Sequence, residues 1–427
     1  MENLFSSRFA FDDASSEEAK ICIVGVGGGG GNAINNMLDK GIHGVQFIAV
    51  NTDAQALTMN RAPHKIQAGR SLTKGLGAGA RPSVGAEAIE ENREQLEQAL
   101  QGFDMIFITA GMGGGTGTGG TPVVASIAKR LGILSVAIVT RPFECEGKRR
   151  MDAAQQGIDA LREQVDTLIV IPNERLLDIA GETTSLIAAF AMADEVLYNA
   201  TRGISDLITV HGLINLDFAD VKTTMQCGGA ALMGAATASG ESRAERAAVE
   251  AISSPLLDGL SITGARNVLV NITAGKSLGI REATDATGII QREAGDDVEV
   301  IFGTVIDESM GDEMRVTVIA TGFDRKHEEA QQQMHDEAAR PRLTLYHDVP
   351  TYNYKGEENL KNLDVPAYVR RNADTPQPIS IDRDAESDSA TTKRRVRRLN
   401  ADDLKDRSER IRNDDSDTPA FLRKMLD

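Results

Sequence analysis

One segment of this 427-residue chain restricts its fold more than any other: an apolar run at residues 105–109 followed by a loop of glycine and threonine. The loop reads GGGTGTG over residues 113–119, and Thr121 with Pro122 then favours a helix start. Glycines let backbone N–H groups approach a polyanion closely, and a helix N-terminus adds positive potential behind them. A flexible linker is the alternative, but such linkers do not normally join a buried strand to a capped helix. The segment therefore predicts a phosphate-binding strand, loop and helix.

Apolar runs alternate with helical patterns from Lys20 to about residue 177, at 21–26, 47–51, 105–109, 134–140 and 168–171. This alternation predicts a parallel sheet covered by helices, and continuously apolar strands are typical of a sheet buried on both faces. A long helix is expected over about 186–208, and its apolar side is expected to carry Leu186, Ile187, Phe190, Val196, Leu197 and Ile204. The region 222–323 is expected to open with a helix of small residues and to add strands at 267–273, 298–306 and 315–320.

The predicted fold class is α/β: a parallel-sheet nucleotide-binding domain, a long central helix, a second α+β domain and a disordered C-terminal tail. Residues 325–416 are dominated by polar and charged side chains and bury too little apolar surface to fold alone. The expected parts are a disordered N-terminal segment 1–19, a nucleotide-binding domain 20–184, the central helix with a catalytic loop 185–221, an α+β domain 222–323, a disordered linker 324–416 and a terminal peptide 417–427.

An eight-residue pattern occurs twice beyond the expected domains. Residues 364–371 read DVPAYVRR, and residues 417–424 read DTPAFLRK. Chance likeness between two snippets of biased composition is one interpretation. The other is a short docking peptide, present twice, that folds into a partner's groove.

Charge and cysteine content narrow the possible functions. The net charge of −17 argues against a nucleic-acid partner, which would need a basic surface. Three scattered cysteines fit a reducing compartment, and no signal peptide is expected at the N-terminus. No apolar run approaches the length that spans a bilayer, so direct membrane insertion is not expected. The expected location is the cytoplasm.

Further loops follow the other expected strands, at the edge of a parallel sheet where ligands bind. They are a glycine run at 25–31, the sequence NTDAQ at 51–55, a third glycine loop at 75–79, residues 141–150, and Asn173 after an expected strand. An acidic residue at Asp53 is compatible with ribose binding in an NAD-dependent dehydrogenase, which is one alternative. Three glycine loops fit a nucleoside triphosphate better, and the 113–119 loop lacks the Lys-Ser/Thr ending of a Walker A motif.

In residue type and order these loops resemble those of FtsZ, the family of bacterial tubulin homologues, from Lys20 to about Gly322. The matching motifs are GGGTGTG, VNTDAQ, KGLGAGA, EGKRR, IPNERLL and NLDFADV. The resemblance implies a GTPase that assembles into head-to-tail protofilaments of the cell-division ring at mid-cell and hydrolyses GTP at subunit junctions. Mg²⁺ would be bound mainly through phosphates and water, without a dedicated set of protein ligands.

The resemblance also implies roles for individual residues. GTP or GDP is expected to contact Gly28, Gly29, Asn32, Asp53, Gly77, Ala78, Gly113, Gly114, Gly115, Thr116, Gly117, Thr118, Gly119, Glu146, Arg150, Asn173 and Glu195. Glu195 is preferred over its neighbour Asp194 as the carboxylate that binds the base, on an alignment without gaps.

Catalytic roles are expected for Asn215, Asp217 and Asp220, which would act on the nucleotide of the next subunit. Without the resemblance, the sequence favours the interpretation of Asp217 and Asp220 as solvated carboxylates beside a buried Phe218. A tubulin-like protein that binds nucleotide without hydrolysing it is the other alternative. The terminal peptide is expected to bind a membrane-tethered adaptor resembling FtsA, through Asp417, Pro419, Phe421, Leu422 and Arg423.

Overall fold

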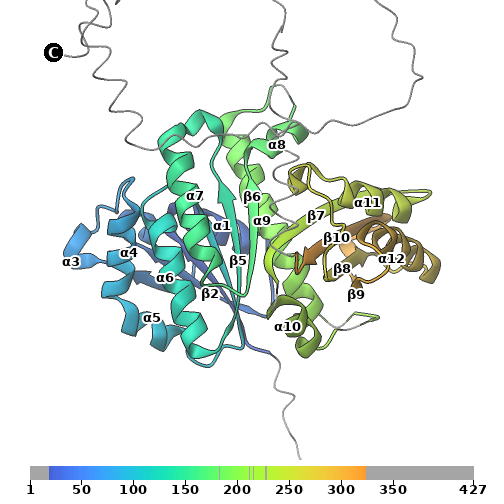
Figure 1. Cartoon of the computed structure of the whole chain (residues 1–427), viewed down its shortest axis with the longest axis horizontal. Coiled ribbons are helices and arrows are strands. Elements are labelled where there is room, and N and C mark those ends of the chain that lie inside the picture. The colour runs from blue at the N-terminus through green and yellow to red at the C-terminus, as the bar shows by residue number, and fades with distance from the viewer. Residues whose placement is uncertain (1–18, 182, 211, 215, 227, 324–427) are drawn as a thin grey trace, which may run out of the picture. The chain divides into compact units, whose positions relative to one another are not determined.

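The computed structural model describes residues 19–323 except 182, 211, 215 and 227, and a ten-stranded sheet runs through this part of the chain (Figure 1). The strands stand in the order β3-β2-β1-β4-β5-β6-β7-β10-β8-β9. Their bounds are β1 Ile21–Val26, β2 Val45–Asn51, β3 His64–Gln67, β4 Met105–Gly111, β5 Leu134–Arg141, β6 Thr167–Pro172, β7 Gly229–Ser239, β8 Asn267–Ala274, β9 Glu299–Ile306 and β10 Glu313–Thr321.

Helices cover both faces of the sheet. They are α1 Gly27–Lys40, α2 Ala54–Met59, α3 Arg70–Thr73, α4 Pro82–Glu91, α5 Arg93–Leu100, α6 Thr116–Leu131, α7 Lys148–Arg162, α8 Glu174–Ile179, α9 Leu186–Thr209, α10 Phe218–Gln226, α11 Arg243–Ile252 and α12 Ile280–Ala294. Three short 3₁₀ turns are η1 Glu144–Glu146, η2 Pro255–Leu257 and η3 Glu308–Met310. The helices α6 and α7 lie side by side over one face (Figure 1).

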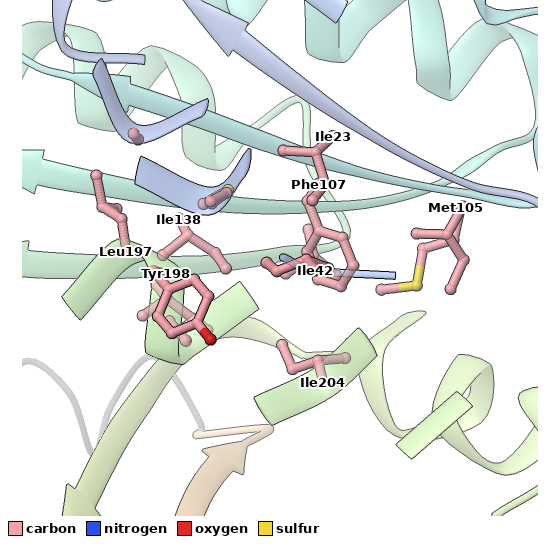
Figure 2. Packing of buried hydrophobic residues seen from close by; sticks show 14 of the residues in the cluster. Ile23, Ile42, Met105, Phe107, Ile138, Leu197, Tyr198 and Ile204 are labelled. Atoms are coloured by element: carbon pink, nitrogen blue, oxygen red, sulfur yellow. The ribbon is translucent and has the colours of Figure 1, made fainter. Parts of the chain in front are cut away.

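The strands β1 to β6 are all parallel, and alternate residues of each strand enter two different cores. On one face Ile23 and Phe107 pack with Leu197 and Ile204 of α9 (Figure 2). On the other face the intervening strand residues pack against α4 to α7. Burial on both faces explains why β1, β2, β4, β5 and β6 have no polar alternation and confirms their prediction from apolar runs. The short strand β3, with exposed His64 and Lys65, is not among the predicted strands.

The second half of the sheet joins the first through a short contact. β7 pairs in parallel with β6 over only Thr167–Ile169 and Gly229–Ala231, and then runs antiparallel to β10 along its length. The predicted strands near 267–273, 298–306 and 315–320 are confirmed as β8, β9 and β10. The predicted helix at the start of this region is only partly right, because α10 ends at Gln226 and the small residues 229–239 form β7.

Small residues in β7 have a packing reason. A Cβ atom on Gly234 would lie 1.9 Å from the carbonyl oxygen of Ala251 in α11, so the helix backbone sits directly on the strand. Close approach of helix and strand therefore selects glycine and alanine here. The resulting composition is similar to that of a helix made of small residues, which explains the wrong prediction.

The long helix is confirmed as α9, although its predicted apolar side is wrong at the N-terminal end. Leu197 and Ile204 are buried, whereas Leu186, Ile187 and Phe190 are 61%, 84% and 40% exposed. At 1.5 Å per residue the 24 residues of α9 extend for about 36 Å. The predicted disordered segments 1–19 and 324–416 and the terminal peptide lie outside the described residues, apart from residue 19.

Candidate functional site

A cavity of about 620 Å³ opens at the carboxyl ends of β1, β2, β4, β5 and β6. Each strand delivers lining residues directly after its last residue, as expected for a ligand site in an open parallel sheet. The predicted nucleotide contacts that line the cavity are Gly28, Gly29, Asn32, Asp53, Gly77, Ala78, Gly114, Gly115, Thr116, Gly117, Glu146, Arg150 and Asn173. Residues expected from distant parts of the sequence are thus brought to one place.

Two helix N-termini, those of α1 and α6, border this cavity. Neither helix has an acidic residue in its first turn, and neither N-cap residue, Val26 or Gly115, caps the helix with its side chain. The first backbone N–H groups of both helices therefore need acceptors from elsewhere. Two positive helix ends without internal caps form a site suited to a polyanion such as a chain of phosphates.

Glycines in this region serve two different purposes. A Cβ atom on Gly28 or Gly114 would have no atom within 4 Å, so at these positions the backbone faces open space. On Gly115 a Cβ atom would lie 2.2 Å from the carbonyl oxygen of Gly79, so this glycine allows the third glycine loop to pack against α6. Gly28 and Gly114 therefore leave room for a ligand, whereas Gly115 allows two loops to pack together.

The helix α6 starts earlier than predicted. It begins at Thr116, and Thr121 and Pro122 lie inside it, so the prediction of a helix start at these two residues is wrong. The Thr121 hydroxyl instead donates to the carbonyl oxygen of Gly117 at 2.5 Å. Because the helix begins within the glycine–threonine loop, its N-terminus reaches the cavity directly.

Some predicted contacts of the 113–119 loop support the site without lining it. Thr118 is buried and its hydroxyl accepts from the Gly113 N–H at 2.8 Å, while a Cβ on Gly119 would clash with Pro82 of α4. Gly113, Thr118 and Gly119 are therefore away from the cavity wall. Thr116 does line it, and its hydroxyl lies 2.6 Å from that of Thr52.

The wall opposite the glycine loops combines an amide, a carboxylate and an aromatic ring. The side-chain oxygen of Asn173 is buried and has no hydrogen-bond partner among the described residues. Burial raises the pKa of the Asp194 carboxyl to about 6. The ring of Phe190 also lines the cavity and meets Phe143 edge to face, with centroids 5.3 Å apart. An unpaired acceptor, a desolvated carboxylate and an exposed ring together match a planar base with N–H donors.

Glu195 does not lie on this wall, and the preference for it over Asp194 needs correction. Its carboxylate pairs with Lys40 at the end of α1 and also lies 3.5 Å from the amide nitrogen of Asn199. Successive residues of a helix point about 100° apart, so when Asp194 faces the cavity Glu195 faces α1. Phe190 is not among the predicted contacts, because its helical spacing predicts a place in the core.

Three other predicted contacts are held in place by neighbours. Arg150 forms an ion pair with Glu146, whose carboxylate also accepts from the Phe143 N–H at 3.0 Å. Asp53 caps α2, and its carboxylate accepts from the N–H groups of Gln55 and Ala56 at 2.8 and 3.2 Å. Each of these three charged groups is thus fixed in orientation before any ligand arrives.

The predicted catalytic carboxylates lie far from this cavity. Asp217 and Asp220 are exposed, at the start of α10, beyond the C-terminal end of α9. From Asp194 to Thr209 the helix alone covers about 22 Å. Asn215 lies outside the described residues, as do Asp417, Pro419, Phe421, Leu422 and Arg423.

Within the described ranges, no helix has the length and hydropathy needed to cross a bilayer. No group of three or more His, Cys, Asp or Glu side chains in this part of the chain is arranged to hold a metal ion.

Comparison with known proteins agrees with this geometry. Residues 20–181 match the GTPase domain of the Tubulin/FtsZ family, and residues 229–324 match the C-terminal domain of the FtsZ family. The chain is similar to an FtsZ of M. jannaschii solved as an empty dimer, with 45% sequence identity, a TM-score of 0.70, and coverage of 72% of this chain and 89% of that one.

Two more distant structures share the fold. CetZ1 of Haloferax volcanii, a GDP-bound monomer, and CetZ2 of the same organism, a GTPγS-bound protofilament, each have 22% identity to this chain. Their TM-scores are 0.63 and 0.61, with 75% of this chain and 99% and 98% of theirs covered.

Proposed function

The chain belongs to the tubulin/FtsZ family, and from this premise we propose that it is a GTPase that assembles head to tail and hydrolyses GTP at the junction between subunits. The observation that carries the proposal is the separation within one chain of a prebuilt nucleotide cavity from the exposed carboxylates Asp217 and Asp220. A second subunit can bring the two together. Family membership favours GTP over the dinucleotide of a dehydrogenase.

In this proposal the phosphates lie between the N-termini of α1 and α6. Backbone N–H groups near Gly28 and Gly114 donate to the phosphate oxygens, and the Thr116 hydroxyl adds a donor. When bound, Mg²⁺ neutralises charge on the phosphates through their oxygens and water. The protein's own contribution is to position the phosphates and to supply fixed dipoles around them.

The base lies against Asn173, Asp194 and Phe190. An ionised Asp194 accepts the N1–H and exocyclic amine of guanine, and adenine has no donor at its N1 position. Asp194 therefore replaces Glu195 as the proposed determinant of guanine specificity. Phe190 contributes its ring as an apolar surface for the base.

Exposed apolar side chains near both ends of α9 support assembly. Leu177 and Ile179 of α8 and Leu186 and Ile187 of α9 are 44% to 84% exposed at the cavity end. Leu213, with 72% exposure, and Ile214 follow the other end. Two different apolar surfaces at opposite ends of one helix suit a heterologous contact, which propagates as a filament when its rotation does not close.

In such a junction Asp217 and Asp220 of one subunit face the γ-phosphate held by the next. There they orient the attacking water, and no group on the wall of the cavity that holds the nucleotide needs to serve as base. The proposal extends to a role in the division ring, in the cytoplasm at mid-cell. The terminal peptide 417–427 then binds a membrane-tethered adaptor resembling FtsA, with Phe421 and Leu422 as apolar anchors.

Sedimentation and phosphate release, measured over a series of protein concentrations, test the proposal. GTP is expected to drive the protein into the pellet, and turnover per subunit should vanish below a critical concentration. Turnover that is constant per subunit at all concentrations would contradict an active site shared between subunits. GTP binding and assembly without phosphate release would assign the chain to the non-hydrolysing alternative.

A further inference from the structure

A second cavity, of about 140 Å³, lies on the α7 face of the sheet where β6 and β7 separate. The two strands are paired only as far as Ile169 and Ala231, and beyond these residues Val170 and Leu232 form opposite walls. The sides are closed by α7 and by η2. The cavity is thus a consequence of the short contact between the two halves of the sheet.

Most of the wall is hydrocarbon. It is formed by Ile158, Leu168, Val170, Leu232, Leu256 and Phe323 among others. A water molecule needs two to four polar partners, which such a wall does not offer over most of its area. A cavity of roughly 150 Å³ with apolar walls accepts a benzene molecule, so the space here suits a phenyl ring or a branched chain of similar size.

The polar groups of the cavity are mainly donors. Arg141, Arg162 and the amide of Gln155 line it, and the Nε atom of Arg162 is buried without an acceptor in the part of the chain that the structure describes. Asp258 is the one carboxylate among the described lining residues, and it is engaged by the Nε of Arg175 at 2.5 Å. A buried guanidinium nitrogen without an acceptor favours an anionic ligand.

We propose that this cavity binds a small aromatic or branched aliphatic carboxylate. The hydrocarbon part lies between Val170, Leu232 and Phe323, and the carboxylate accepts from the Nε–H of Arg162. Neither an inorganic anion nor a purely apolar molecule satisfies both the wall and the arginine. The ligand is a free small molecule and not a segment of protein, since the cavity of about 140 Å³ is the size of one ring.

The position of the cavity relates it to the nucleotide cavity. Pro172 lines the one and Asn173 lines the other, and the same holds for Arg141 and Pro142. The Asn173 N–H donates to the Arg141 carbonyl oxygen at 3.0 Å. The ends of β5 and β6 are therefore common to both cavities.

Ligand-observed NMR on the full chain tests the proposal, with 3-phenylpropionate as probe and its amide, 3-phenylpropanamide, as a neutral partner of the same shape. The acid is expected to bind saturably, and the amide about tenfold more weakly because it lacks the charge-assisted hydrogen bond. Both measurements are made with and without saturating GDP. Loss of the acid's signal on adding GDP would place it in the nucleotide cavity and overturn the proposal.

Three variants locate the site. Arg162→Gln is expected to reduce the affinity of the acid to that of the amide, while Arg149→Gln on the same helix leaves it unchanged. Ala230→Leu, on the opposite wall, fills the space and is expected to abolish binding of both compounds even if Arg162→Gln proves unstable. Equal affinity for acid and amide, or acid binding that survives Ala230→Leu, would contradict the proposal.

Discussion

The two ends of α9 differ in how completely the fold prepares them. At the N-terminal end Asp194 and Phe190 complete a cavity whose other walls are the ends of five strands and two helix N-termini. At the C-terminal end Asp217, just before α10, and Asp220, in its first turn, are exposed, and neither residue lines this cavity. One end is a binding site within a single chain, and the other presents carboxylates with no substrate in reach.

In the proposed mechanism this difference divides binding and catalysis between the two ends. Binding requires preorganised donors, which only a packed sheet edge supplies, and the glycine loops are fixed by contacts such as that of Gly115 with Gly79. Catalysis that depends on assembly instead requires an active site that is incomplete in one subunit and is completed by a neighbouring subunit. The predictions below alter one end and ask whether the other end responds.

The largest effect is expected from Asp220→Ala. Loss of a group that orients water at a junction should reduce turnover by roughly 10²- to 10⁴-fold. GTP binding and filaments should persist, because the cavity end is untouched. Phosphate release and sedimentation measure the two properties separately, with Asp296→Ala as a matched exposed carboxylate. If Asp220→Ala neither binds GTP nor sediments, the division between the ends is wrong.

Gly114→Val should abolish binding at the cavity end while the fold survives. A Cβ at this position meets no protein atom within 4 Å, so the added side chain projects into the space for phosphate. We expect GTP affinity to fall by roughly 100-fold, since several charge-assisted hydrogen bonds are lost. Titration calorimetry measures the affinity, and Gly288→Val on α12, where a Cβ is likewise unobstructed, is the control. Unchanged affinity would remove the 113–119 loop from the phosphate site.

Asp194→Asn is expected to lower the affinity for GTP and to raise the stability of the nucleotide-free protein. GTP affinity is expected to fall roughly 10- to 100-fold with the loss of a charged acceptor. Because burial raises the pKa of Asp194 to about 6, the folded chain binds this proton more tightly than the unfolded chain does. The stability of the nucleotide-free protein should therefore decrease as pH rises from about 4 to 6, and the variant should lack this decrease.

At pH 7.5, with partial exposure of the side chain taken into account, the variant should be more stable by about 1–2 kcal/mol. GTP affinity of the unaltered protein should weaken as pH falls through 6, because the protonated carboxyl no longer accepts from guanine. Denaturant titrations and calorimetry at several pH values measure both effects. A variant that loses stability at pH 7.5 would contradict the assignment of Asp194 to the cavity.

The smallest effect is expected from Glu195→Gln, the neighbouring carboxylate. Its partly exposed pair with Lys40 should contribute about 0.2–1 kcal/mol to stability, and GTP affinity should change less than twofold. Measured beside Asp194→Asn, this variant decides between the two residues. A larger loss of affinity in Glu195→Gln than in Asp194→Asn would restore the preference based on sequence alone.

Much of the fold follows from local sequence. The strands β1, β2 and β4 to β6 are apolar because they are buried on both faces, and such runs are readable without structure. The start of α6 cannot be read from the sequence in this way. Thr121 and Pro122 favour a helix start, but the preceding residues 116–120 already adopt the helical conformation. The sequence does not predict β7, because its small residues are required by close packing against α11. A contact between two segments distant in sequence leaves no local pattern.

The candidate site is predictable to a similar degree. Glycine loops after strands identify the phosphate-binding end of the cavity, because only glycine lets backbone N–H groups approach a phosphate closely. The choice between Asp194 and Glu195 depends on the rotation of α9 against the sheet, which only packing determines. Phe190 is missed for the same reason, since an aromatic residue at helical spacing suits the core equally well.

An equimolar mixture of the Asp220→Ala and Gly114→Val proteins tests the central claim most directly. Each variant alone should be nearly inactive, because one lacks the catalytic carboxylate and the other the phosphate site. In filaments that incorporate both proteins at random, roughly a quarter of the junctions should pair an intact cavity with an intact carboxylate loop, and turnover per subunit in these filaments should recover to about that fraction. If turnover of the mixture is no higher than the sum of the turnovers of the two variants measured alone, and both proteins are present in the pellet, the active site is not shared between subunits.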